Sequence, residues 1–136
     1  PNGADASQEL VNSGLADGRI KPRMMSNGGY GEFIFRGINS TNWLLFGINT
    51  GIVGNDIEVW KQVAGVYTRI LQTGGDMVAG QYYIMECEYR GSLIRFYRDS
   101  VFLASVVETD NQAGTLVGPR LREGNGRVDW YEVRAA

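Results

Sequence analysis

The fold is decided by residues 80–118, which read GQYYIMECEYRGSLIRFYRDSVFLASVVETDNQAGTLVG. Tyr83, Met85, Cys87 and Tyr89 alternate there with the side chains at 82, 84, 86 and 88, two of which are glutamates. A period of two is typical of a β-strand with one buried face. Polar turns at 90–92 and 98–100 separate this strand from two further apolar runs, which predicts consecutive hairpins.

Short β-rich runs continue on both sides of this stretch. Turn residues separate five of them, at 30–38, 43–48, 57–63, 66–71 and 128–133. We count roughly ten short strands at the 8–12-residue spacing of a sandwich or barrel, with no convincing helix and no repeat of solenoid or propeller period. The sequence therefore predicts an all-β protein, a single jelly-roll-type antiparallel β-sandwich over residues 1–136, with 1–7 as a flexible lead-in.

Two of the runs carry more specific information. Residues 43–48, WLLFGI, are almost continuously apolar, which predicts a central strand covered on both faces. Pro22 interrupts the run 19–25. Since proline cannot donate to a strand ladder, this run is expected to be an edge strand or to contain a bulge.

Several motifs resemble one superfamily. They are Tyr97-Arg98-Asp99-Ser100, where relatives commonly have a Tyr-x-Asp-Gly turn, together with FIFR at 33–36, Asn42-Trp43 and the final VDWYEVRA. This pattern resembles the concanavalin A-like lectin/glucanase superfamily, especially its laminin-G-like jelly-roll sandwiches, from about residue 20 onward. These motifs are specific for the fold and poor for function.

Composition excludes several classes of function. The 136 residues have a net charge of −2, which argues against a general nucleic-acid binder. No apolar run approaches the roughly 20 residues that span a bilayer. Histidine is absent, which excludes Ser-His-Asp and Cys-His catalysis. Cys87 is the only cysteine, which excludes an internal disulfide and, without histidine, a structural zinc site. By alternation Cys87 is a small buried hydrophobe, and stability must come from packing.

The first ten residues, PNGADASQEL, show no signal peptide, since they lack a basic start and an apolar core. Two explanations stay open. The chain is either a processed piece or excised domain of a larger secreted protein, or a complete cytoplasmic product that has lost its initiator methionine, as suits a viral structural protein. Both lead to an extracellular or virion-surface location as the expectation.

Carbohydrate binding without catalysis suits the suspected fold. Sugars stack their apolar faces on aromatic rings, and their hydroxyl groups need amide, carboxylate or guanidinium partners. Trp60 and Tyr82 are the strongest platforms, although a core position for Trp60 is an equal alternative. Trp43 is expected in the core. The other candidates are Tyr67 and Trp130 as platforms, and Arg36, Arg69, Asn42 and Glu86 as polar partners.

A glycan hydrolase is the third-ranked hypothesis. It needs two carboxylates about 5–10 Å apart, and Glu86 and Glu88, like Asp56 and Glu58, lie on one strand face with Cα atoms about 6.5–7 Å apart. However, the glucanase pattern E-x-D-x-x-E is missing, because Glu88 replaces its Asp and Gly91 its last Glu. A solvated strand face is the favoured interpretation.

No cofactor is expected, except that the resemblance leaves calcium open. Asp110, Asn111 and Asp56 are the available oxygen ligands, although acidic turn residues are usually only turn formers.

The sequence favours a non-catalytic recognition module whose partner is a glycan. The runner-up is a structural module of a virion, a tail or a cell surface, whose partners are further subunits or copies of itself in a symmetric array. In that case the aromatic surface serves assembly.

Overall fold

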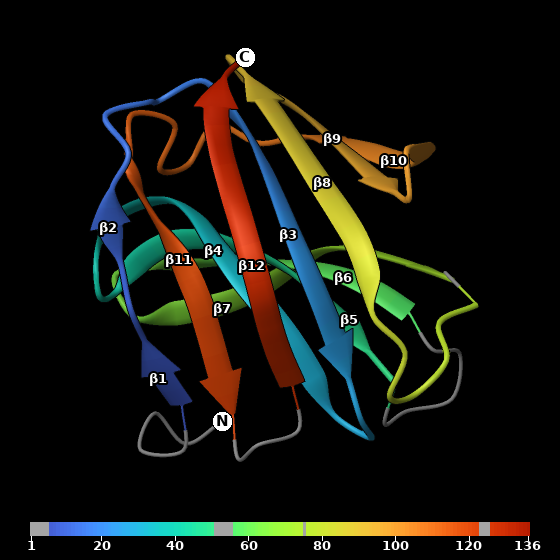
Figure 1. Cartoon of the computed structure of the whole chain (residues 1–136). Helices are drawn as coiled ribbons and strands as arrows, with labels where there is room; N and C mark the ends of the chain where they lie inside the picture. Colours follow the sequence, from blue (N-terminus) through green and yellow to red (C-terminus); the bar gives the residue numbers. More distant parts are fainter. Residues whose placement is uncertain (1–5, 51–55, 75, 123–125) are drawn as a thin grey trace.

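The computed structural model describes residues 6–50, 56–74, 76–122 and 126–136. Two antiparallel sheets pack face to face (Figure 1), which confirms the predicted sandwich. Of the predicted lead-in, residues 1–5 lie outside the described part, and β1 begins at Ala6.

One sheet has seven described strands in the order β1-β11-β4-β5-β6-β7, with β2 also paired to β11. Its members are β1 (Ala6–Gln8), β2 (Val11–Asn12), β4 (Tyr30–Asn39), β5 (Asn42–Asn49), β6 (Asp56–Val63), β7 (Val66–Gly74) and β11 (Leu116–Arg122). The other sheet has five, in the order β10-β9-β8-β3-β12. These are β3 (Gly18–Ser26), β8 (Tyr83–Arg90), β9 (Leu93–Arg98), β10 (Val101–Val107) and β12 (Gly126–Ala135).

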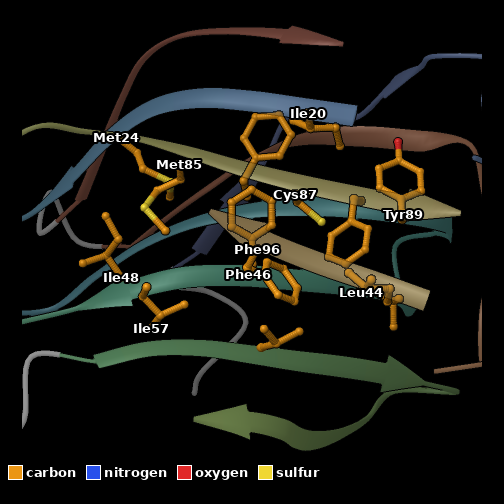
Figure 2. Packing of buried hydrophobic residues seen from close by; sticks show 14 of the residues in the cluster. Ile20, Met24, Leu44, Phe46, Ile48, Ile57, Met85, Cys87, Tyr89 and Phe96 are labelled. Atoms are coloured by element: carbon orange, nitrogen blue, oxygen red, sulfur yellow. The ribbon is translucent and has the colours of Figure 1, made fainter. Parts of the chain in front are cut away.

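The main core fills the space between the two sheets. The inward side chains of β8 are those predicted by alternation, and they meet phenylalanines of the facing sheet. Figure 2 shows Cys87, Phe46 and Phe96 pointing into this space. Burial raises the pKa of the Cys87 thiol well above its usual value, as expected for a structural cysteine.

The seven-stranded sheet is apolar on its outward face as well. Strand β5 is buried along both faces, which confirms the prediction for 43–48. Its alternate residues Trp43 and Leu45 form a second cluster with Ile34 of β4, away from the main core. The predicted burial of Trp43 is therefore correct, but its ring lies on the outward face.

Two hairpins use left-handed turn residues. Ala64 and Gly65 connect β6 to β7 with φ of 49° and 81°, and Asp99 and Ser100 connect β9 to β10 with φ of 48° and 69°. Positive φ at both central residues is typical of a type I′ turn. Asp99 stabilises its turn, because its side chain accepts a hydrogen bond from the backbone N–H of Ile84 at 3.0 Å. Ser100 thus adopts a positive φ at the position where the sequence resemblance implied glycine.

The expectation of an edge position for Pro22 is wrong. Strand β3 lies between β8 and β12. The register with β8 is the same before and after the proline, at Ile20 with Cys87 and at Arg23 with Ile84. The irregularity lies instead in the neighbouring strand β12, between Val128 and Trp130. An interior strand thus accommodates the proline, and its pairing with β8 keeps one register on both sides of it.

The described part of the chain contains no helix that is both long and apolar enough to cross a membrane.

Candidate functional site

A cavity of about 200 Å³ opens on the outward face of the seven-stranded sheet. Strand alternation places its side chains, because outward residues of β4, β5, β6, β7 and β11 meet there. We call this cavity the aromatic hollow, and it is lined by Tyr30, Glu32, Trp43, Leu45, Trp60, Tyr67 and Arg120.

The floor and the walls of the aromatic hollow differ in burial. Trp43 is fully buried, and its indole Nε1 donates a hydrogen bond to the Ser40 carbonyl oxygen at 3.2 Å. The Tyr67 ring packs edge-on against it, with centroids 5.6 Å apart at 70°. Trp60 and Tyr67 are only half-buried, so their rings form walls that a ligand can reach.

A buried ion pair lies at the base of the aromatic hollow. Arg120 faces Glu32 across the β11–β4 register, and an Nη1–Oε1 distance of 3.1 Å joins side chains that are 1% and 3% exposed. The Arg120 guanidinium also lies 5.5 Å from the Trp43 ring centroid and 5.9 Å from that of Tyr67. Among the described residues its Nε has no hydrogen-bond partner.

A second polar group fixes the Trp60 wall. The buried Glu58 carboxylate accepts hydrogen bonds from Trp60 Nε1 at 3.2 Å and from Asn49 Nδ2 at 2.8 Å. Arg69 contacts the same carboxylate at 3.4 Å, and its guanidinium lies 5.7 Å from the Trp60 ring centroid. The indole is therefore held on its polar edge and near its face.

Comparison with solved structures finds close matches over nearly the whole chain. The carbohydrate binding module CBM66 from Bacillus subtilis matches with a TM-score of 0.78 at 12% identity, covering 96% of this chain and 83% of that one. The galectin LEC-6 from Caenorhabditis elegans has a TM-score of 0.69 at 15% identity, with coverages of 93% and 89%. A toad ovary galectin complexed with N-acetylgalactose gives 0.69 at 16%, with 93% and 97%.

The chain has the concanavalin A-like lectin/glucanase fold. This confirms the resemblance drawn from the sequence, and at these identities it concerns the fold alone. No family model and no curated protein matches the sequence.

On this concanavalin A-like sandwich the residues predicted for sugar binding fall into two groups. Trp60, Tyr67 and Arg69 come together at the aromatic hollow. Glu86 belongs to β8 of the five-stranded sheet, and Tyr82 directly precedes that strand. Tyr82 is covered by the Arg23 guanidinium at 4.1 Å from its ring centroid, and Glu86 lies on the outward face of β8, opposite to Met85 and Cys87. The predicted set is therefore not one site.

Arg36 does not reach the sandwich surface, which corrects its prediction as a sugar partner. Its side chain is 0% exposed, and its Nε donates to the Ala16 carbonyl oxygen at 3.1 Å. The guanidinium lies 5.1 Å from the Tyr89 ring centroid, and burial lowers its pKa. The cause is a backbone irregularity, because Arg36 has a φ of 48° where the β4–β5 register shifts. Its side chain therefore leaves the outward face that alternation from Ile34 predicted.

The remaining polar candidates of the sequence have structural partners. The Asn42 side chain lies in the β4–β5 turn, where it accepts a hydrogen bond from the Ala64 N–H at 2.8 Å. Glu86 contacts Arg19 at 3.2 Å and Lys21 at 3.6 Å.

Glu88 of β8 does not have the electrostatic environment of a glycosidase acid. A hydrogen bond from Arg19 at 2.6 Å lowers the pKa of Glu88, whereas a glycosidase acid needs a raised pKa.

Two of the proposed calcium ligands, Asp110 and Asn111, have partners within the protein. Asp110 contacts Lys61 at 2.7 Å, and the Asn111 amide donates to the Gln62 carbonyl oxygen at 3.1 Å. The Asp56 side chain lies outside the described part. No group of three or more acidic, cysteine or histidine side chains among the described residues could hold a metal ion.

Sequence reasoning missed Tyr30, Glu32 and Arg120, and it did not connect Glu58 with the sugar hypothesis. Glu32 carried a usable signal, because it alternates with Phe33 and so shares the outward face of Ile34. Arg120 carried none, since its position depends on the pairing of β11 with a strand more than 80 residues earlier, as the Glu32 contact with its separation of 88 shows.

Proposed function

We propose that this protein is a non-catalytic carbohydrate-binding module and that the aromatic hollow is its site. The observation that carries the proposal is Trp60, a half-buried indole fixed by Glu58 at the wall of a small cavity. The fold neighbours are a carbohydrate binding module and galectins, which supports the same class of ligand. An extracellular or virion-surface location belongs to this proposal.

The chemistry of the aromatic hollow matches the chemistry of a sugar. Trp60 and Tyr67 offer apolar rings for the C–H face of a pyranose or furanose. The ion pair of Glu32 with Arg120 lines the aromatic hollow, and the ion pair of Glu58 with Arg69 lies beside its Trp60 wall. Each pair combines a strong acceptor with a strong donor. Hydroxyl groups both donate and accept, so a polyol can use both members of each pair.

The test is a glycan-array screen followed by calorimetry on the best ligand. Trp60→Ala should weaken binding at least tenfold, which is about 1.4 kcal/mol. Trp130→Ala is the matched control, because Trp130 is 43% exposed and belongs to the other sheet. Its affinity should equal that of the wild type.

Each variant is also followed by thermal unfolding, because Trp60 packs against the second cluster. Repeating the titration in chelator separates calcium-dependent from calcium-independent binding. The proposal fails if no glycan binds, or if Trp60→Ala and Trp130→Ala behave alike while both stay folded.

A second candidate function, assembly with further copies, is favoured by the edge strand β10. This strand reads VFLASVV, without charge or proline, and Val101, Phe102 and Val107 are exposed. Its register with β9 shifts between Phe102 and Ala104, and an apolar edge strand without charge or proline can pair with another strand. Sedimentation velocity should then show a concentration-dependent dimer that Phe102→Lys abolishes and Val66→Lys, at an exposed residue of β7, retains. A monomer at every concentration would reject this function.

A further inference from the structure

The charges at the aromatic hollow are compensated within the protein. Arg120 is paired with Glu32 at 3.1 Å, and Arg69 with Glu58 at 3.4 Å. Glu32, Arg120 and Glu58 are buried. A ligand that carried its own charge into this site would lose hydration without meeting an uncompensated counter-charge, which is unfavourable.

Aromatic rings can bind a cationic ligand, but here arginine side chains of the protein already lie against them. Clusters of Trp and Tyr bind ammonium groups through their ring faces. Here the Arg120 guanidinium lies 5.5 Å from the Trp43 ring centroid and 5.9 Å from that of Tyr67. Arg69 lies 5.7 Å from the Trp60 ring centroid. A cationic ligand would therefore meet two guanidinium groups at the rings that should attract it.

The size of the aromatic hollow limits the ligand as well. Its volume is about 200 Å³, below the range of about 300–1,000 Å³ that is typical of small-molecule sites. A hollow of this size suits one sugar ring and its hydroxyl groups better than a longer ligand. The floor cannot deepen, because Trp43 and Leu45 are buried parts of the central strand β5. We therefore expect a second ring to lie at or beyond the rim of the aromatic hollow.

We infer that the aromatic hollow takes a single uncharged sugar ring, either free or at the end of a glycan chain, and that the Glu32–Arg120 pair in its lining, together with the Glu58–Arg69 pair beside Trp60, makes it reject charged sugars. The inference rests on the proposed function and deepens it, because it names the class of sugar. Arg120 is the residue whose charge keeps other cations away from the Trp43 and Tyr67 rings.

The experiment compares sugars that share one ring and differ only in charge. Calorimetry at pH 7 uses the methyl glycosides of glucose, galactose and mannose, each with its uronic acid and its 2-amino-2-deoxy derivative. For the hexose that binds, both charged derivatives should bind at least tenfold more weakly. In an oligosaccharide series of this hexose, stoichiometry should stay at one protein per chain end as the chain grows.

Trp60→Ala is included in every titration to show that binding occurs at the aromatic hollow. A charged derivative that binds as tightly as the neutral sugar, in a Trp60-dependent manner, overturns the inference and leaves the proposed function intact. Binding of several protein molecules along one long glycan chain would also overturn the inference and leave the proposed function intact. If no carbohydrate shows Trp60-dependent binding, both the inference and the proposed function are wrong.

Discussion

Replacing Arg120 by methionine should lower the free energy of unfolding by about 3–5 kcal/mol, the usual cost of breaking a buried ion pair from one side. The Glu32 and Arg120 side chains are 3% and 1% exposed, so the charge that remains after the substitution is poorly hydrated. At their separation of 3.1 Å, an effective dielectric constant of 20 gives an attraction of about 5 kcal/mol, which agrees with that range.

Glu32→Gln breaks the same pair from the other side but keeps the guanidinium against the Trp43 and Tyr67 rings. Contacts of this kind contribute about 0.5–2 kcal/mol, so Arg120→Met should be the more damaging of the two single changes. The double variant Glu32→Gln/Arg120→Met leaves no isolated charge from the pair and should be more stable than either single variant.

The assay is a double-mutant cycle by urea unfolding, followed by far-ultraviolet circular dichroism and tryptophan fluorescence at 25 °C. The double variant keeps the test decisive even if Arg120→Met is too unstable to fold. The reasoning is refuted if each single change costs less than about 1 kcal/mol and the two effects add, since independent sites behave in this way.

Three further predictions concern stability. Tyr89→Phe should leave the free energy of unfolding unchanged or raise it, because the buried Tyr89 hydroxyl has no hydrogen-bond partner among the described residues. Tyr83→Phe should lower the free energy of unfolding by about 1 kcal/mol, because the Tyr83 hydroxyl accepts a backbone hydrogen bond of 2.8 Å. Equal losses of stability for the two variants in urea unfolding would contradict this prediction. Gly118→Ala should cost about 1–3 kcal/mol, because its new methyl group meets backbone, while Gly74→Ala meets nothing and serves as the control for the same measurement. Glu88→Gln should cost at most about 1 kcal/mol at pH 7. The hydrogen bond from Arg19 lowers the pKa of Glu88 in the folded state. The stability lost in Glu88→Gln should therefore disappear as the pH falls below about 4.3, the unfolded-state pKa, and through the folded-state pKa. A loss of stability that is constant between pH 7 and pH 2 would contradict the ion-pair explanation.

The elements that the sequence predicts well are those specified by neighbouring residues. Strand β8 follows from alternation, and the β6–β7 hairpin follows from Ala64-Gly65 between two β-rich runs. This hairpin also explains why part of the candidate site was found. Trp60 and Arg69 are direct partners in its register, so a local hairpin is enough to bring them together.

The errors come from contacts that neighbouring residues do not specify. Glu32 and Arg120 are 88 positions apart, and only the strand order of the sheet makes them adjacent. Arg36 was misplaced because the register shift in β4 reverses the side to which its side chain points. Tyr82 has the aromatic character of a platform, but it directly precedes β8, and the Arg23 guanidinium of the paired strand β3 lies 4.1 Å from its ring centroid.

The double-faced burial of β5 has a consequence for how new specificities could arise on this scaffold. Trp43 and Leu45 form the base of the aromatic hollow, while Leu44 and Phe46 of the same strand belong to the main core. Substitutions of Trp43 and Leu45 at the base would therefore also disturb the packing that stabilises the fold. Variation is tolerated at the rim, where positions such as Tyr67 are partly solvated. Directed evolution of a new ligand preference should therefore diversify the rim and leave the central strand unchanged.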